Sequence, residues 1–517
     1  MTRTSWKFGA LAGVAAAAVA LGLAEVVAVL TGSRSAPLVA VGGVVVDHVP
    51  ESLKQFAITL FGVHDKTALL IGTAVLLLAF AALIGALSVR WPAAGFAGIG
   101  LFAAIGVAAA LTRPDAGIGA AFPALLGAAA AGATLWLLVL GPLAPAEVTA
   151  LPAPSVQEEE EAVAGRRRFL RSGLLFIAGA AVLGFAGRLL STRRSVSSAR
   201  AEVRLPAPAS PAPEVPAGAD LRLADLSSYV TPNDAFYRID TALVVPQVDP
   251  LDWSLRIHGR VRKEIRLSYA DLLALPMIER YVTLACVSNE VGGDLIGNAR
   301  WLGVPLKRLL DEAQPLDGAD QVVGRSADGW TCGTPTEVLR DGRDAMLAVG
   351  MNGAPLPIEH GFPVRVVVPG LYGYVSATKW VVELEVTSFA DYDAYWVPRG
   401  WSAKGPIKTQ SRIDTPRGRG DLKPGPVTVA GVAWAQHRGI AKVEVQVDDA
   451  PWQEARVARA VSDDTWVQWS WHWEAESGDH VLRVRATDKN GETQTSQPAE
   501  VIPDGATGYH TVSVTVA

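Results

Sequence analysis

The N-terminal part of the chain contains five apolar segments that are long enough to cross a membrane. They cover residues 7–30, 67–89, 93–111, 117–141 and 172–190. A helix needs about 20 mostly apolar residues to span the hydrocarbon core of a bilayer. A chain with this pattern cannot fold as one soluble globule. We therefore expect a multidomain protein that begins with a four-helix, α-helical transmembrane domain in residues 1–145.

Basic residues set the expected orientation of these segments. Arg3 and Lys7 lie before and at the start of the first segment, Arg90 follows the second, and a cluster at 166–171 precedes the fifth. Lys and Arg collect on the cytoplasmic side of membrane proteins. An N-terminus inside the cell and five crossings place everything after residue 190 outside. The sequence thus predicts a multi-pass cell-membrane protein with an extracytoplasmic remainder, and an external loop or interfacial hairpin at 32–66.

Residues 146–199 are expected to form a linker that ends in the fifth helix. The run Gly-Arg-Arg-Arg-Phe-Leu-Arg at 165–171 resembles the twin-arginine export motif, and its alternative reading is a positive-inside flank on an ordinary helix. The acidic run at 158–161 reads as a solvated linker. Residues 200–220 are rich in Pro and Ala, which predicts an extended spacer.

The chain has two cysteines, so a disulfide framework is not expected. Cys286 ends an apolar, strand-like run at 281–285 and precedes a turn of small and polar residues. This position suits a metal ligand or a nucleophile, although a cysteine with apolar neighbours is often an inert core residue. Cys332 reads as a free, buried thiol. The net charge of −5 suggests no nucleic-acid surface.

Four further segments, taken together with Cys286, indicate what kind of site this cysteine belongs to. They are Thr-Pro-Asn at 231–233, a Gly-rich passage at 292–301 that ends in Ala-Arg-Trp, His-Gly-Phe-Pro-Val-Arg at 360–365, and Lys-Trp at 379–380. Together with the cysteine they resemble the molybdenum-cofactor domain of the sulfite oxidase family. The resemblance implies an α+β, molybdopterin-binding oxidoreductase domain at 221–422, with the molybdenum–molybdopterin cofactor (Moco) held by a cysteine thiolate.

The resemblance also implies roles for individual residues. Cys286 would be the thiolate ligand of the metal, and Arg238 is the nearest match to an active-site arginine, with its spacing shifted by about one residue. A thiolate is a soft donor, and guanidinium and ammonium groups suit an anionic pterin phosphate. The residues expected to bind the cofactor are Ser288, Asn289, Arg300, His360, Arg365 and Lys379.

Two departures from the family pattern bear on the substrate. Sulfite-oxidising members have basic residues after the Cys-x-x-Asn turn, where this chain has Glu290 and Val291. An acidic residue there disfavours a sulfite dianion. The position of the family's active-site tyrosine falls on Trp401, and the nearby tyrosines that could replace it are Tyr372, Tyr374, Tyr392 and Tyr395. The substrate is therefore expected to be an oxyanion such as sulfite, or an S- or N-oxide.

Residues 423–517 alternate like the strands of a β-sandwich, at 426–434, 441–447, 466–473, 480–486 and 512–516. They resemble the immunoglobulin-like dimerisation domain that follows the cofactor domain in this family, which implies a homodimer through this domain. Among its tryptophans, 466, 469, 471 and 473 are expected to fill the core and an interface.

The expected function is thus a membrane-anchored molybdenum oxidoreductase that transfers an oxygen atom at Cys286. The alternative is a non-catalytic membrane-anchored binding or receptor protein that keeps the fold without the chemistry. The sequence has no Cys-x-x-Cys-His motif and no cysteine set for an iron–sulfur cluster. A separate electron carrier, a cytochrome or a quinone-linked protein, is therefore expected as a partner.

Overall fold

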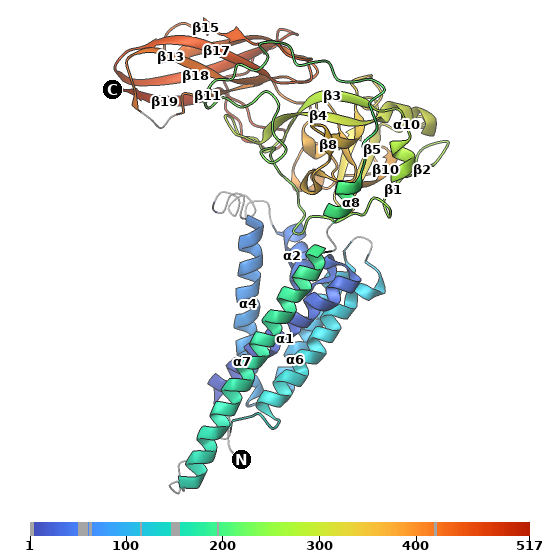
Figure 1. The fold of residues 1–517 in the computed structure, drawn as a ribbon, viewed down its shortest axis with the longest axis vertical. Coiled ribbons are helices and arrows are strands. Elements are labelled where there is room, and N and C mark those ends of the chain that lie inside the picture. The colour runs from blue at the N-terminus through green and yellow to red at the C-terminus, as the bar shows by residue number, and fades with distance from the viewer. Residues whose placement is uncertain are drawn as a thin grey trace. The chain divides into compact units, whose positions relative to one another are not determined.

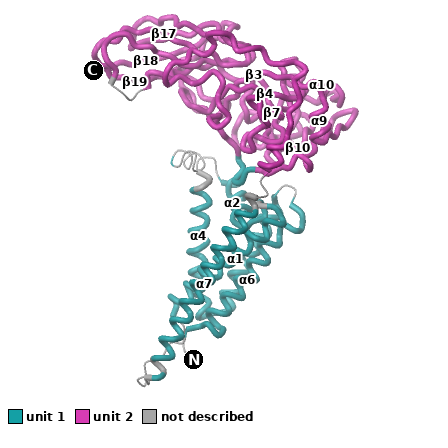
Figure 2. Tube along the Cα trace, viewed as in Figure 1, with its two compact units in different colours: residues 1–195, 241–245 teal, residues 196–240, 246–517 magenta. Residues whose placement is uncertain are grey.

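The computed structural model describes residues 5–49, 60, 65–113, 116–145, 156–193, 196–417 and 421–517. The chain divides into two compact units, which Figure 2 draws in teal and magenta. The first unit holds residues 1–195 and 241–245, and the second holds residues 196–240 and 246–517.

The first unit is helical (Figure 1). Small residues let its helices pack closely, because a Cβ on Gly13 would lie 2.0 Å from the carbonyl oxygen of Ala81 on the neighbouring helix. Phe169, from the arginine-rich motif, is fully buried and packs edge-on against Phe8 at 5.1 Å. The elements are α1 (Trp6–Thr31), η1 (Ser33–Ser35), α2 (Pro37–His48), α4 (Asp65–Ser88), α5 (Pro92–Leu111), η3 (Ile118–Ala121), α6 (Phe122–Val139) and α7 (Val156–Arg193).

Five of these helices are long and apolar enough to cross a membrane, and they coincide with the five predicted segments. Large apolar side chains remain exposed on their outer faces, including Leu76, Phe80 and Leu83 of α4. The predicted linker at 158–161 is wrong in its conformation, because α7 begins at Val156 and runs through the acidic run. Glu, Ala and Arg are good helix formers, which explains the extension. Of the predicted loop at 32–66, residues 50–59 and 61–64 lie outside the described residues, and the rest includes α2.

The second unit begins with α8 (Ser197–Glu202) and contains two sheets that carry the candidate site. One has the order β3-β4-β7-β8, with β9 paired to β7, and the other has the order β2-β1-β10-β5-β6. Their strands are β1 (Ser254–Gly259), β2 (Ile265–Ser268), β3 (Ile278–Ala285), β4 (Ile296–Pro305), β5 (Gln321–Ser326), β6 (Thr331–Pro335), β7 (Met346–Met351), β8 (Ala354–Pro355), β9 (Arg365–Val367) and β10 (Val381–Thr387).

Short helices join these strands. Ser268 caps α9 (Tyr269–Leu273) with a reciprocal hydrogen-bond pair to Asp271. The other helices are α10 (Leu306–Ala313), η4 (Ile358–His360), η5 (Gly373–Val375) and η6 (Val397–Arg399). Apolar residues of β3, β4, β7 and β9 form one core with Phe362, and Trp301 is fully buried in it.

Two further sheets follow, with the orders β11-β13-β17-β16 and β12-β19-β18-β14-β15. Their strands are β11 (Gln410–Thr415), β12 (Asp421–Leu422), β13 (Gly425–Trp434), β14 (Ile440–Val447), β15 (Gln453–Glu454), β16 (Arg456–Val457), β17 (Val467–Ala475), β18 (Gly478–Asp488) and β19 (His510–Val516). Side chains from both sheets share a core that includes Trp469 and Trp473. Val432, Trp434 and Trp466 instead join the core of the preceding sheets, so the two parts of this unit are packed together.

Candidate active site

The segment at 231–240 is fixed to the end of β4 by backbone and amide hydrogen bonds. The Thr231 N–H donates to the Asn298 carbonyl (2.8 Å), and the Asn298 N–H donates to the Thr231 hydroxyl (3.1 Å). The Asn352 amide donates to the Asn233 side chain (2.7 Å). Phe236 then lies against Gly297, where a Cβ would come within 2.7 Å of its ring. The side chains after Phe236 are therefore held in a fixed place.

Cys286 directly follows β3 and is buried. Its N–H donates to the Leu295 carbonyl (2.9 Å), which joins the two ends of the following turn. Burial raises the pKa of the thiol, while hydrogen bonds from Ser288 and from the Val287 N–H and the charge of Lys379 act in the opposite direction. These donors and the ammonium group would stabilise a thiolate, which is the form that binds a metal.

The turn after Cys286 is closed by Asn289, whose side-chain oxygen accepts the Leu295 N–H (2.8 Å). Asn289 was expected to bind the cofactor, and the contact that the structure gives for its side chain is this one, which closes the turn. Arg412, on β11, donates to the Gly293 carbonyl (2.5 Å) and to Asp414 (2.6 Å). The loop that carries the cysteine is thus braced from the C-terminal sheets. Glu290 lies in this loop with an exposed side chain.

His360 and Arg365 lie on the segment that joins η4 to β9, and both are buried. The His360 Nε2 lies 3.1 Å from the Asn233 carbonyl oxygen, and burial lowers the pKa of His360 to about 4. The imidazole is therefore neutral at pH 7 and donates this hydrogen bond.

Arg365 makes only backbone hydrogen bonds, to the carbonyls of His360 (3.2 Å) and Val366 (3.4 Å), and its guanidinium lies 5.0 Å from the centre of the Trp301 ring. Among the described residues no carboxylate forms an ion pair with it. Burial lowers the pKa of Arg365 to about 10, and the group stays charged at pH 7. A buried cation without a counterion is costly unless an anion is bound beside it.

Lys379 and Arg238 share one carboxylate, that of Asp240. The Lys379 ammonium lies 2.7 Å and the Arg238 Nε lies 2.9 Å from the same Asp240 oxygen. Asp240 is buried, and so is Lys379, whose pKa is lowered by burial to about 8. The charges of Arg365 and Arg238 act on Lys379, and that of Lys379 acts on Cys286. The structure thus brings these four predicted residues together, and adds Asp240, which sequence reasoning missed.

The side chain of Arg300 contacts residues other than the predicted cofactor ligands. Its guanidinium pairs with Glu279 (3.3 Å), and its backbone N–H donates to Asn352 (2.9 Å). It supports the turn that holds the 231–240 segment, and no side-chain contact to the other predicted residues is found in the described part of the chain.

The tyrosines near the expected family position are mostly engaged elsewhere. Trp401 is buried, and its indole N–H has no partner among the described residues. Tyr374 donates to the Ser402 carbonyl (2.8 Å), the Tyr372 hydroxyl accepts the Lys408 N–H, and Tyr392 lies 3.4 Å from the Thr331 hydroxyl. Tyr395 has the Arg399 guanidinium over its ring, 3.8 Å from the ring centre.

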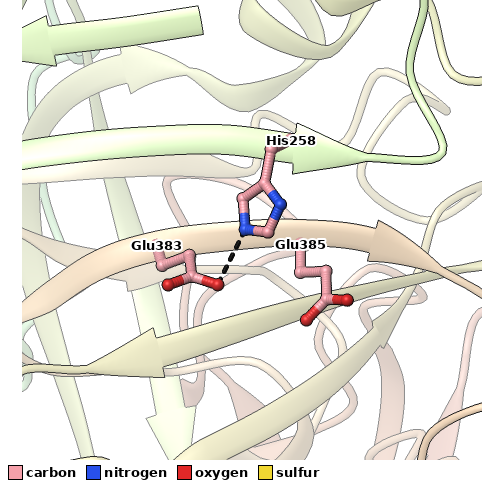
Figure 3. Close-up of side chains that lie close together, drawn as sticks. All are labelled: His258, Glu383 and Glu385. Carbon is pink, nitrogen blue, oxygen red and sulfur yellow. Dashed lines mark hydrogen bonds and ion pairs between the residues drawn. The ribbon is translucent and has the colours of Figure 1, made fainter. Parts of the chain in front are cut away.

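A second group of titratable side chains lies on the other sheet. His258 Nε2 is 2.7 Å from a Glu383 oxygen, and Glu385 projects beside them from β10 (Figure 3). Arg325 lies 3.7 Å from Glu383 and 3.8 Å from Glu385, so a cation already balances the carboxylates. This group is an ion-pair network of the β1–β10 pair, with a structural role.

Comparison with known proteins agrees with this geometry. Residues 242–396 match the family described as oxidoreductase molybdopterin binding domain. Mouse mitochondrial sulfite oxidase is 32% identical over 272 residues, which cover 44% of this chain and 49% of that protein. Sulfite oxidase of Arabidopsis thaliana is 31% identical, covering 45% and 72%. An uncharacterized oxidoreductase of Bacillus subtilis is 31% identical, covering 36% and 91%.

The domain that carries the buried Cys286 thiol and the buried Arg365 is thus that of a molybdopterin-dependent oxidoreductase. Its cofactor is molybdenum–molybdopterin. The chain belongs to the sulfite oxidase-like family. It matches only 49% to 62% of the length of the mouse, human and chicken sulfite oxidases. A solved sulfane dehydrogenase from Paracoccus pantotrophus aligns with a TM-score of 0.49 and 23% identity, over 57% of this chain and 88% of that one.

Proposed function

We propose that this protein is a membrane-anchored oxidoreductase that transfers an oxygen atom to or from a small molecule at molybdenum bound by Cys286. The observation that carries the proposal is the presence of two buried groups in the same sheet, Cys286 after β3 and Arg365 on β9. Cys286 offers a thiol surrounded by hydrogen-bond donors, and Arg365 offers a buried cation that lacks a carboxylate partner. An anionic cofactor with a thiophilic metal satisfies both groups at once.

The cofactor, when bound, supplies the two-electron redox chemistry. The chain's own residues hold and orient it. Arg365 supplies a planar set of charged donors for the pterin phosphate, and the neutral His360 remains fixed to the Asn233 carbonyl. Hydrogen bonds from Ser288 and from the Val287 N–H would stabilise the thiolate form of Cys286 and so oppose the effect of burial, which raises the pKa of this thiol. Asn289 holds the cysteine loop closed through the Leu295 N–H.

The distribution of charge around the site favours a neutral S- or N-oxide over a sulfite dianion. Asp240 pairs with both Arg238 and Lys379, and its single negative charge offsets one of their two positive charges. Glu290 adds a negative charge where sulfite-oxidising relatives have basic residues. Because Glu290 is exposed, its repulsion is screened by water, and the buried Asp240 has the larger effect.

The helical unit supports a membrane anchor with the catalytic domain on the extracytoplasmic side. Five apolar helices, and the arginine run in the N-terminal half of the last of them, favour this topology. Export in the folded state through a twin-arginine route suits a domain that receives its cofactor in the cytoplasm. The C-terminal sheets would form an immunoglobulin-like dimerisation domain, and a separate cytochrome or quinone-linked carrier would exchange electrons with the site.

The test is metal analysis and turnover of the full-length protein purified in detergent. About one molybdenum per chain and turnover of methionine sulfoxide or trimethylamine N-oxide, with slow turnover of sulfite, support the proposal. Cys286→Ser should abolish turnover per bound molybdenum, since a hydroxyl is a harder donor than a thiolate. The matched control is Cys332→Ser, which changes the other buried thiol, 3.0 Å from the Thr378 hydroxyl. Turnover retained in Cys286→Ser, or an absence of molybdenum from the wild type, would overturn the proposal.

A further inference from the structure

The loop that carries the cysteine is bonded to an arginine of the C-terminal sheets. The loop begins at Cys286 and is closed where the Cys286 N–H donates to the Leu295 carbonyl (2.9 Å). Inside the loop, the Gly293 carbonyl accepts a hydrogen bond from Arg412 Nη1 (2.5 Å). Arg412 lies on β11, more than a hundred residues further along the chain. A side chain outside the cysteine's own sheet therefore holds the middle of its loop.

The Arg412 guanidinium is fixed in its direction by other partners. It is buried, and two of its nitrogens bond away from the loop, Nε to Asp414 (2.6 Å) and Nη2 to the Ser227 hydroxyl (2.9 Å). Asp414 is buried as well, and its other oxygen accepts the Ser227 N–H (3.0 Å). Since Asp414 already balances the charge of Arg412, the bond to Gly293 serves to hold the loop. A planar set of donors that is fixed on one side can hold a carbonyl in one direction.

A second side chain of the C-terminal sheets limits the loop at the preceding residue. Gly292 has a φ of +81°, and a Cβ on it would lie 2.2 Å from the ring of His510 on β19. His510 is itself held, because its Nδ1 accepts the Ile413 N–H of β11 (3.0 Å). The loop is thus bonded at one residue and sterically confined at the next, and both contacts come from the C-terminal sheets.

We propose that Arg412 is a positioning residue for the metal ligand, and that it sets the direction of the Cys286 thiolate by holding the Gly293 carbonyl. Groups that bond to a metal ligand's surroundings orient the ligand and tune the metal, because the overlap between sulfur and metal orbitals depends on the direction of the Cβ–Sγ bond. The C-terminal sheets are then part of the active site as well as a domain of their own. This inference rests on the proposed function, in which Cys286 binds molybdenum.

The experiment compares Arg412→Lys with Arg438→Lys in the full-length protein purified in detergent. Arg412→Lys keeps a cation beside Asp414, but one ammonium nitrogen cannot take the places of three guanidinium nitrogens. Arg438 is the matched control because it also pairs with a buried carboxylate of the C-terminal sheets, Asp488 at 2.8 Å. Its guanidinium donates to the Ile407 carbonyl (2.9 Å), which lies outside the cysteine loop.

The first measurement is hydrogen exchange in protein made without cofactor synthesis. The reporters are the amides of Cys286 and Leu295, whose hydrogen bonds close the loop. Arg412→Lys should speed their exchange about tenfold or more, as expected for the loss of one charge-assisted hydrogen bond, and should leave the amides of β13 unchanged. Arg438→Lys should leave the loop amides at the wild-type rate.

The second measurement uses the molybdenum-loaded protein. Arg412→Lys should keep the wild-type molybdenum content, change the thiolate-to-metal absorption band, and lower turnover of methionine sulfoxide per molybdenum about 10–100-fold. Arg438→Lys should change neither the band nor the turnover. Wild-type loop exchange in Arg412→Lys, an equal rise in the loop and in β13, or an unchanged band would overturn the inference and leave the proposed function standing. A wild type without molybdenum would overturn both.

Discussion

Arg365 provides the sharpest test of whether this site is built for an anionic cofactor. Burial lowers its pKa from the ordinary value of 12.5 to about 10, and a tenfold change in a proton equilibrium corresponds to about 1.4 kcal/mol, so the charged group costs the cofactor-free fold about 3 kcal/mol. Its two backbone hydrogen bonds offset about 1–3 kcal/mol of this cost. Arg365→Met should therefore change the stability of the cofactor-free protein by less than about 1 kcal/mol, or raise it.

The assay is native-state hydrogen exchange of β7, since Ala348 and Leu347 pair with Arg365 and Val366 of β9. Protein made without cofactor synthesis gives the opening free energy, and protein made with it gives the molybdenum occupancy. We expect occupancy to fall, because loss of a charge-assisted partner weakens phosphate binding by about 1.5–3 kcal/mol.

The control is Arg412→Met, which also removes a buried guanidinium. Arg412 has a buried carboxylate partner, Asp414, at 2.6 Å. Breaking that pair should destabilise the fold by about 3–5 kcal/mol, because Asp414 is left without its cation. If Arg365→Met destabilised β7 as strongly as this and molybdenum occupancy stayed normal, Arg365 would be a structural residue and the reasoning would be refuted.

Three further outcomes follow from the structure. Asp240→Asn should release Arg238 and Lys379 and lower the KM for sulfite severalfold at low salt, with little effect on an S-oxide; steady-state kinetics at two salt concentrations would check this. Burial lowers the pKa of Lys379 to about 8, so its ammonium group is mostly charged at pH 7 and mostly neutral at pH 9. Uptake of the cofactor by cofactor-free protein should therefore weaken between pH 7 and 9, by up to about tenfold per pH unit. Lys379→Arg should remove this dependence. Changing Arg166 and Arg167 to Lys should leave the catalytic domain protected from protease in spheroplasts if a twin-arginine route exports it, whereas a simple positive-inside flank would leave it digestible.

Patterns in the sequence predicted the positions of those helices and strands that depend on neighbouring residues alone. Apolar length located the five candidate spans to within a few residues, except that the fifth helix is longer at both ends. Alternation located β13, β14, β17, β18 and β19. Ser268 at the start of α9 is another local feature, because a capping residue acts on its own first turn.

Contacts between segments that are distant in the sequence could not be predicted from such local patterns. Asp240 follows Arg238 by two residues, but its pairing with Lys379 depends on how β10 and the 231–240 segment meet. The sequence signal for Asp240 is its position two residues after Arg238, because a buried carboxylate is commonly paired with a cation.

The segment at 231–240 therefore has two functions that the motif alone does not separate. Its first half, Thr231 to Asn233, attaches the segment to β4 and to the turn after β7 through hydrogen bonds that involve the Thr231 hydroxyl and the Asn233 and Asn352 side chains. Its second half places the Arg238 guanidinium and the Asp240 carboxylate beside Lys379. Because the first half fixes the backbone, side chains in the second half can change without loss of the cofactor fold. Substrate choice in this chain is thus expected to depend on Asp240 more than on the residues that hold the pterin.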